Sequence, residues 1–297
     1  MERGQQTLAE RARIALERAR KARLKAARIA RERAEKERRK EVRQARWRAE
    51  HAPFTVNIAT FNVLGSQHST RGGSHPSHPP ASVRTARAAG YVARHGADIV
   101  GTQELQADQL RQLTNLTGMA AYPGFGWGEK ETDNSILYDA GVYEFVSGDT
   151  YYVTFVNRTR PQPILRLRHR ATGREFYVLN THTSPGDGVA QAERYRAHAT
   201  TSSLVRKLRG SGLPVLLTGD MNDRQEFFCR VVATAGMTTP QGGTYGNGCR
   251  PPAGHLAVDW VAGAGVASWS DYWMDMTSVA NKTSDHFVVS AVAHVGD

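Results

Sequence analysis

Cysteine is scarce in this sequence, and long apolar runs are absent. Only 2 of the 297 residues are Cys, too few for a small protein built on disulfides or for a zinc site with four thiolate ligands. No run reaches the roughly 18 apolar residues of a membrane-spanning helix, so we expect no transmembrane segment. The mixed composition, with 40% hydrophobic residues, excludes collagen-like repeats and a wholly disordered chain. The length is sufficient for one large domain or two small ones.

Acidic residues are strongly outnumbered by basic ones only in the amino-terminal part of the chain. The formal net charge is +11, and residues 1–50 alone carry 18 Lys and Arg against 8 Asp and Glu. Residues 51–297 hold the remaining 21 basic and 20 acidic residues. The basic balance is therefore a property of the first segment, and it does not make the rest of the protein a nucleic-acid binder.

Residues 1–50 are predicted to form a charged helical arm, followed by a separate domain at 51–297. Neither Gly nor Pro occurs between Gly4 and Pro53, and the Ala, Arg, Lys and Glu that dominate are strong helix formers. The apolar positions keep no heptad, which disfavours a coiled coil. Two roles remain open: a solvated tether, or a basic arm that contacts a polyanion such as nucleic acid or an anionic membrane surface.

The domain that follows consists of short apolar runs bounded by turn residues. Strands are predicted at Phe54–Phe61, Asp98–Gln103, Ser135–Tyr138, Val142–Val146, Tyr151–Val156, Ile164–Arg168, Glu175–Asn180, Pro214–Thr218, Leu256–Val261 and Phe287–Ala293. Helices are predicted at Ser82–His95, Ala107–Leu116, Gly188–Arg209 and Gln225–Ala235. Strands outnumber helices and occur in both alternating and hairpin arrangements. This pattern predicts an α/β or α+β sandwich of two packed sheets with helices on the outer faces.

Polar side chains stand at the ends of six predicted strands. They are Asn62, Glu104, His182, Asp220 with Asn222, Asp259, and Asp285 with His286. One polar strand end is ordinary, but six are more than a purely structural sheet needs. Together they would supply oxygen ligands for a hard cation, two imidazoles and further carboxylates.

These residues carry a family resemblance. The motifs TFNV, QE, NTH, TGDMN, DW and SDH, in this order, resemble those of the endonuclease/exonuclease/phosphatase family, which includes deoxyribonuclease I. The resemblance covers about residues 54–295 and leaves the arm aside. It implies a four-layer αββα sandwich of two mixed sheets and a catalytic domain at 51–297. It also implies metal-dependent hydrolysis of phosphate esters.

The resemblance also implies a metal site. Glu104 would be the main ligand of Mg²⁺, with Asn62 and Asp285 nearby. Few protein ligands are expected, because Mg²⁺ keeps several waters and binds substrate phosphate oxygens. Mn²⁺ is an alternative ion, and an added structural Ca²⁺ is not excluded.

The catalytic roles follow from the same resemblance. His286 matches the catalytic histidine of the family, and Asp259 matches the carboxylate that pairs with it. Such a partner fixes the tautomer of a general base. Asp220 would orient or activate the attacking water. Asn222 and His182 would donate hydrogen bonds to the non-bridging phosphate oxygens.

Each of these residues also has a structural interpretation. Asn62 and Asn222 would serve equally as turn residues, and Glu104 as a helix cap. Asn134 is a candidate substrate contact because its segment, Asp133–Tyr138, resembles one that feeds the family's site. A turn at the start of a strand is the competing interpretation there.

Cys229 and Cys249 are candidates for a disulfide. They lie twenty positions apart around a Gly-rich loop, and a bridge there would add about 3 kcal/mol of stability. Deoxyribonuclease I carries a disulfide in the corresponding region, which favours an extracellular setting. No signal peptide is recognised, because Arg and Lys interrupt every stretch long enough for its apolar core. A cytoplasmic enzyme with two free thiols remains the alternative.

Three functions are therefore compared. The first is a nuclease acting on DNA or RNA, and the second is a phosphatase or phospholipase-like enzyme acting on a phosphorylated lipid or small molecule. The third is a non-catalytic protein that binds polyanions through its arm. The loop at 66–80, with His68, His75 and His78, directly follows Asn62 and is expected to shape the substrate cleft.

Overall fold

A computed structural model describes residues 2–296, with the side chains of residues 2–6, 45–46 and 48–50 left aside. The internal contacts divide the chain into two units, residues 1–51 and residues 52–297. Each unit is described by itself.

The first unit is one helix, α1 (Glu2–His51). Ion pairs four residues apart form along it, including Lys21–Glu17 at 3.0 Å and Arg28–Glu32 at 3.6 Å. Its apolar side chains stay exposed, with Leu16 at 72% and Trp47 at 59%. Propensity and charge pairing therefore support this helix, since the side chains described along it bury no apolar face. Among the described residues, no helix is long and apolar enough to cross a bilayer.

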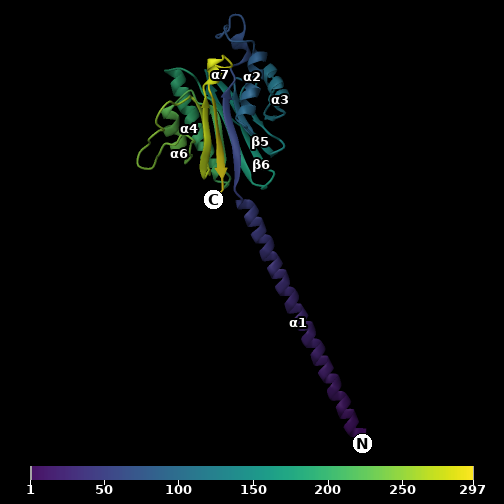
Figure 1. The fold of residues 1–297 in the computed structure, drawn as a ribbon. Helices are drawn as coiled ribbons and strands as arrows, with labels where there is room; N and C mark the ends of the chain where they lie inside the picture. Colours follow the sequence, from purple (N-terminus) through teal and green to yellow (C-terminus); the bar gives the residue numbers. More distant parts are fainter. Residues whose placement is uncertain (1, 297) are drawn as a thin grey trace. The chain divides into compact units, whose positions relative to one another are not determined.

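The second unit contains two mixed sheets (Figure 1). The first has the strand order β10 (Ser268–Asp275), β11 (Val288–Val295), β1 (Phe54–Asn62), β2 (Ile99–Gln103), β4 (Ile136–Tyr138) and β3 (Ala120–Tyr122). The second has the order β5 (Tyr143–Phe155), β6 (Arg158–His169), β7 (Glu175–His182), β8 (Val215–Asp220) and β9 (Asp259–Ala264). Each sheet has one parallel pair, β1/β2 and β7/β8, and the other pairs are antiparallel.

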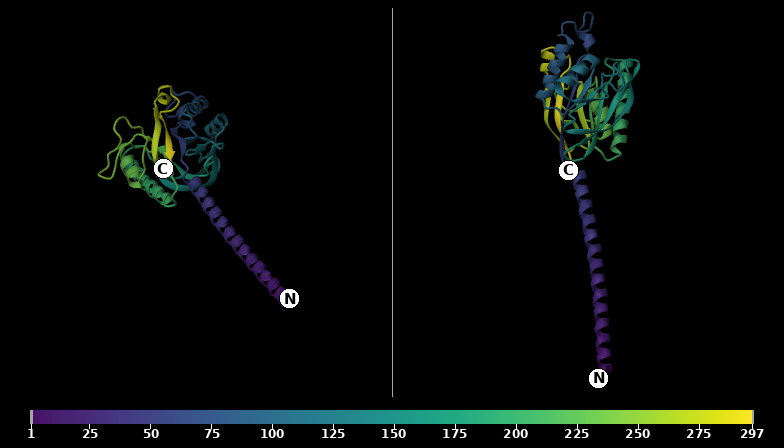
Figure 2. Two further views of the ribbon diagram at one scale, coloured as in Figure 1. Left: turned by 60° about the horizontal axis from the view of Figure 1, so that its bottom comes forward. Right: turned by 90° about the vertical axis from the view of Figure 1, so that its right-hand side faces the viewer.

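Helices cover the outer face of each sheet, as the views in Figures 1 and 2 show. The first sheet carries α2 (Ala81–Arg94) and α3 (Ala107–Thr117). The second carries α4 (Val189–Arg209) and a helical stretch made of α5 (Gln225–Phe227), the π-helical η2 (Phe228–Val232) and α6 (Ala233–Ala235). Two short elements, η1 (Ser66–Ser69) and α7 (Thr277–Ala280), lie in connections.

The alternation of side chains along β1 shows how the layers are built. Val56 and Ile58 belong to the apolar cluster between the sheets, whereas Ala59 and Phe61 pack with residues of α2 and α3. A third cluster joins the second sheet to its helices. Three apolar layers separate four structural layers, so the αββα sandwich is confirmed. The same period of two places Asn62 toward the second sheet at the end of β1.

Most of the expected elements are present, with differences in some bounds. The strand expected at 164–168 is longer, because β6 already begins at Arg158. The expected strands 142–146 and 151–156 form one strand, β5, because residues 147–150 between them also pair with β6, after a bulge between Phe145 and Ser147. The strand expected at 256–261 begins only at Asp259, because the Leu256 carbonyl accepts a hydrogen bond from Arg224 instead of joining the sheet. Strands β3 and β10 were not expected.

Candidate active site

The expected site residues lie at one edge of the two sheets. The parallel pairing of β1 with β2 sets Asn62 opposite Gln103, and that of β7 with β8 sets His182 opposite Asp220. The antiparallel strand β9 begins at Asp259, directly opposite Asp220. The strand ends therefore bring together residues that lie far apart along the chain.

Asn62 links the two sheets. Its Nδ2 donates to Oε1 of Glu104 at 3.0 Å and to Oδ2 of Asp220 at 3.1 Å. Its backbone carbonyl accepts from the Ser284 hydroxyl at 2.6 Å, which ties the segment before His286 to β1. The Asn62 side chain thus contacts both a candidate metal ligand and a candidate catalytic carboxylate.

Two imidazoles face Asp220. His182 Nε2 lies 3.3 Å from Asp220 Oδ2, and His286 Nε2 lies 3.5 Å from the same oxygen. The other ring nitrogen of His286, Nδ1, lies 3.0 Å from Asp259 Oδ2. The Asp220 side chain is 1% exposed and that of Asp259 is 2% exposed. Buried carboxylates require such partners, because an unpaired buried charge is strongly destabilising.

The site shifts the pKa of its groups. Burial raises the pKa of Asp259 to about 6, against the opposing effect of His286. Burial lowers the pKa of His286, but the nearby Asp259 and Asp220 outweigh it and raise that pKa well above its usual value. Burial would raise the pKa of Asp220, yet His286 and His182 hold it below the usual range. Several titratable groups with shifted pKa values in one place are typical of catalytic sites.

Glu104 occupies a more open part of the edge. Its side chain is 24% exposed, and its Oε2 accepts a hydrogen bond from the Gly65 N–H at 3.2 Å. Burial would raise its pKa, but a hydrogen bond with His68, the charge of His182 and the bond from Asn62 lower it well below its usual value. Glu104 is therefore an anionic carboxylate that water can reach.

Three residues at the same strand ends have strained backbone conformations. Glu104, Asn222 and Leu64 have φ angles of 59°, 45° and 56°. Residues other than Gly rarely adopt backbone angles in this left-handed region, and Asn adopts them more readily than most residues. Such conformations persist where the surrounding structure imposes them, often at functional sites.

Asn222 and Asn134 adjoin the cluster by different routes. The Asn222 backbone N–H donates to Asp220 Oδ1 at 2.9 Å, and its Nδ2 donates to the Thr183 carbonyl at 2.8 Å. Asn134 Nδ2 donates to Gln162 Oε1, which also accepts from the backbone N–H of His182. Asn134 is thus joined to the cluster through Gln162.

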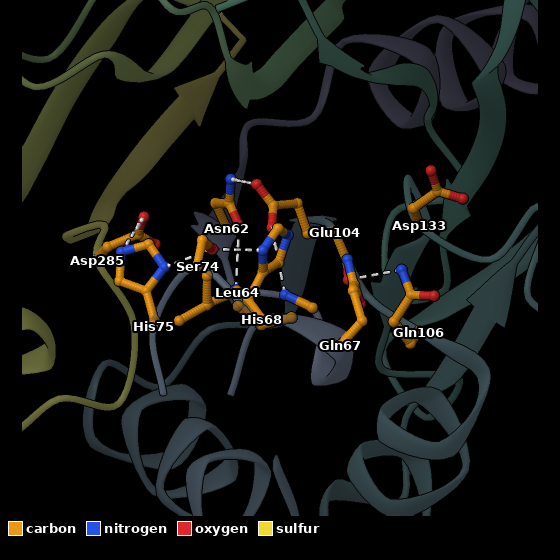
Figure 3. Close-up of polar contacts among 12 residues, drawn as sticks. Asn62, Leu64, Gln67, His68, Ser74, His75, Glu104, Gln106, Asp133 and Asp285 are labelled. Carbon is orange, nitrogen blue, oxygen red and sulfur yellow. Dashed lines mark hydrogen bonds and ion pairs between the residues drawn. The ribbon is translucent and has the colours of Figure 1, made fainter. Parts of the chain in front are cut away.

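Asp285 faces away from this network toward the loop at 65–80. Its Oδ2 lies 3.5 Å from His75 Nε2 (Figure 3). It precedes His286 in sequence, so it lies beside the cluster, but its ion-pair partner is a loop histidine. The structure therefore gathers all eight expected catalytic and metal-site residues at one edge, with Asp285 at the margin.

Two donor sets here would fit a cation. Ligand atoms of Asp220, Asp259 and His286 lie within 4.8 Å of one another, but the first two side chains are almost fully buried and His286 is engaged by Asp259. Glu104 offers carboxylate oxygens with access to water. Because Mg²⁺ keeps several of its waters, the residues around Glu104 fit a hydrated divalent ion better.

Sequence patterns did not reveal every residue of the network. Gln162 lies between two prolines in β6, and nothing in the sequence marks it as a neighbour of His182. Gln103 donates to the Asn180 side chain at 2.7 Å, forming a buried polar layer behind Glu104. Gln103 and Asn180 belong to the motifs QE and NTH. The sequence therefore indicated their positions but not the contact between them.

Cys229 and Cys249 are joined in a disulfide, with their Cα atoms 5.7 Å apart. The bond ties the helical stretch after β8 to the Gly-rich loop that leads toward β9. It lies outside the polar cluster, so its contribution is to the order of that loop.

Comparison with known proteins agrees with the fold and with the family resemblance. Residues 59–291 match the Endonuclease/Exonuclease/phosphatase family. A protein of that family from Bacteroides thetaiotaomicron has 18% identity and a TM-score of 0.61, over 82% of this chain and 96% of that one. The mannosyl-6-phosphatase of the same organism has 18% identity and a TM-score of 0.59, over 80% of this chain and 98% of that one. Truncated TDP2 from Caenorhabditis elegans has 18% identity and a TM-score of 0.62, over 81% of this chain and 97% of that one. No curated protein matches the chain significantly.

Proposed function

The chain belongs to the endonuclease/exonuclease/phosphatase family, and we propose that it is a divalent-metal-dependent phosphodiesterase that cleaves nucleic acid. Members of this family hydrolyse phosphate esters. The observation that carries the proposal is the continuous contact from Glu104 through Asn62 to Asp220 and His286. It joins the proposed cation site to a paired histidine through successive contacts of 3.0, 3.1 and 3.5 Å.

Glu104 is the proposed main metal ligand, with Asn62 beside it and Asp285 at the margin of the site. Mg²⁺ is the proposed ion, and Mn²⁺ is the alternative. When bound, it would neutralise charge on the phosphate and hold it for in-line attack. Asn62 orients Glu104 through the hydrogen bond to Oε1, as groups behind a metal ligand commonly do.

His286 is the proposed general base. Because Asp259 engages Nδ1, Nε2 is the nitrogen that would accept the proton of the attacking water. This role requires the neutral ring, and Asp259 and Asp220 raise the pKa of His286, so activity should increase with pH. Asp220, 3.5 Å from this nitrogen, orients the same water. A base held by a carboxylate in this way keeps one tautomer throughout the reaction.

His182 and Asn222 are proposed to stabilise the developing negative charge. His182 Nε2 lies 3.3 Å from Asp220 Oδ2, and both side chains are buried. The amide of Asn222 carries two N–H groups, and only one is given to the Thr183 carbonyl. The remaining N–H can donate to a non-bridging phosphate oxygen. Asn134 is proposed as an outer substrate contact.

The substrate class is proposed from charge. The arm carries 18 basic and 8 acidic residues, which favours a polyanionic substrate over a small phosphate ester. A phosphatase is the second candidate, favoured by the likeness to a mannosyl-6-phosphatase in fold. The relative turnover of diesters and monoesters separates the two.

We expect the purified full chain to nick plasmid DNA and to hydrolyse a bis-aryl phosphate with Mg²⁺ or Mn²⁺, and to lose both activities with a chelator. His286→Ala should lower kcat by about 10²–10⁴-fold, the usual contribution of a general base. His294→Ala is the matched control, because His294 binds Ser270 at the far end of β11. Full activity of His286→Ala would remove the assigned base. A higher kcat/KM on an aryl monoester than on the diester would favour the phosphatase.

A further inference from the structure

A cavity adjoins the candidate active site on the side of β8 and β9. It has a volume of about 440 Å³ and is lined by two segments, residues 223–226 after β8 and residues 254–256 before β9. The first segment directly follows Asn222. In the second, the centroid of the His255 ring lies 6.0 Å from that of Phe287, the residue after His286. Both walls of the cavity are therefore close to proposed catalytic residues.

The size and the lining of the cavity indicate what it could bind. Pockets for small molecules commonly have volumes of about 300–1,000 Å³, and this cavity lies within that range. Leu256 is the one large apolar residue among those that line it, and most of the others carry charged or polar side chains. Such a lining favours a polar or charged occupant over an apolar one.

The two carboxylates of the lining are paired with cations from neighbouring helical segments. Asp223 Oδ2 lies 3.4 Å from Arg194 Nε of α4, and Glu226 Oε2 lies 3.2 Å from Arg230 Nε. Neither Arg194 nor Arg230 lines the cavity. The negative charges of the lining are thus compensated from outside the cavity.

Arg224 is the remaining charged residue of the lining, and it forms no ion pair with any described residue. Its Nε donates to the Leu256 carbonyl at 2.8 Å, which holds the side chain against the second segment. The N–H groups on its two Nη atoms have no acceptor within the described part of the chain. A guanidinium presents its donors in a planar fork that matches a phosphate group. The cavity therefore offers an anchored cation to an anionic ligand.

We propose that this cavity is a subsite for the phosphate of the nucleotide next to the scissile bond, and that Arg224 binds this phosphate. The inference deepens the proposed function and rests on it in placing the scissile phosphate beside Asn222. Two residues of chain span at most about 7 Å, so Arg224 lies close enough to Asn222 to contact the neighbouring phosphate of the same strand. A substrate with two successive phosphates then binds more tightly than a small phosphate ester with one.

The test is calorimetric titration of the full chain, in the presence of Mg²⁺, with thymidine 3′,5′-bisphosphate and with each of the two thymidine monophosphates. The bisphosphate carries two phosphates on one nucleoside, so it can occupy both positions. We expect wild type to bind it at least about tenfold more tightly than either monophosphate, because an Arg–phosphate contact is a charge-assisted hydrogen bond.

Substitutions then show whether Arg224 causes this preference. Arg224→Gln should reduce the affinity ratio to less than about threefold, although Gln can still donate to the Leu256 carbonyl and keep the second segment in place. Arg224→Lys keeps the positive charge and should retain part of the preference. Arg196→Met is the matched control, because it removes an exposed cation of α4 outside the cavity and should keep the wild-type ratio.

Several outcomes would overturn the subsite. Wild type that binds the bisphosphate no more tightly than a monophosphate would do so, as would an unchanged ratio in Arg224→Gln. An equal loss in Arg196→Met would mean that overall charge sets the ratio. Nucleic-acid hydrolysis by wild type without the binding preference would contradict the subsite alone. A preference that depends on Arg224, without hydrolysis of any diester with any metal, would instead contradict the proposed function.

Discussion

His198 is a titratable residue buried outside the proposed site. It lies on α4, is 1% exposed and packs edge-on against Phe227. Burial lowers its pKa to about 3, and the charges of Arg194 and Arg230 act in the same direction. The ring is therefore neutral in the folded protein at every pH at which the enzyme would be expected to work.

This shift predicts a loss of stability in mild acid. Below the ordinary His pKa of 6.5, the unfolded chain binds a proton at His198 that the folded protein does not bind until about pH 3. Stability is thus fully present above pH 6.5 and falls by up to about 1.4 kcal/mol per pH unit as the pH decreases toward 3.

The measurement is urea unfolding of wild type and His198→Leu at pH 7, 5.5 and 4.5. We expect the variant to lose less stability than wild type across this range, because Leu has no proton to take up. Comparison with the variant removes the contribution of the carboxylates that both proteins share. Parallel pH profiles would show that His198 is not the group responsible.

The residues of the candidate site differ in how visible they are in the sequence. Asn62, Asp220 and Asp259 stand at the ends or starts of apolar strands, so pairing alone brings them to one edge. The contact between His68 and Glu104 depends on a loop whose path is set by Arg84. Sequence patterns indicate where a loop lies but do not give its path, so the histidines were expected near the cleft without a partner.

Among the elements, α2 has a role beyond covering the first sheet. Its Arg84 satisfies carbonyls at both ends of the 65–80 loop. Each carbonyl left without a donor in a buried place costs about 1–3 kcal/mol. The helix therefore fixes the loop that lies against Glu104 and Asp285.

We predict that Arg84→Met lowers the free energy of unfolding by about 3 kcal/mol and increases amide hydrogen exchange in residues 65–80. Arg87→Met is the matched control on the same helix, because Arg87 bonds the Asn281 carbonyl at an exposed position. That variant should lose less than about 1 kcal/mol. Equal losses in both variants, or unchanged exchange in the loop, would contradict the anchoring role of Arg84.

Hydrophobic pattern predicted most elements of the fold, and its errors have physical reasons. Long helices such as α4 and buried strands such as β8 have strong periodicity or continuous apolar runs. Strand β10 is largely exposed along one face and lies at a sheet edge, so its burial pattern is weak. The turn between β5 and β6 uses Val156 and Asn157 with positive φ, and Val is an uncommon residue for such a turn.

At the scale of the whole molecule, charge and proposed chemistry are separated between the two units. The polar cluster around Asp220 lies within residues 52–297, whereas the excess of basic residues lies in residues 1–50. The ion pairs along the arm are exposed and add only a few tenths of a kcal/mol each. We propose that the basic charge of the arm contacts a polyanion.

Deletion of residues 1–50 should therefore affect binding and turnover differently. We expect weaker binding of a short DNA duplex at low salt and a smaller decrease of log affinity with log salt concentration, because fewer counterions are released. The kcat/KM for a small bis-aryl phosphate should stay within about twofold of the full-length value. Such a substrate carries too little negative charge to depend on the arm, and the polar cluster is retained. Binding is measured by fluorescence anisotropy between 50 and 200 mM salt, the range over which phosphate contacts weaken steeply. An unchanged salt dependence would mean that the arm does not contact phosphates. A loss of small-diester turnover would mean that the arm is required by the catalytic domain.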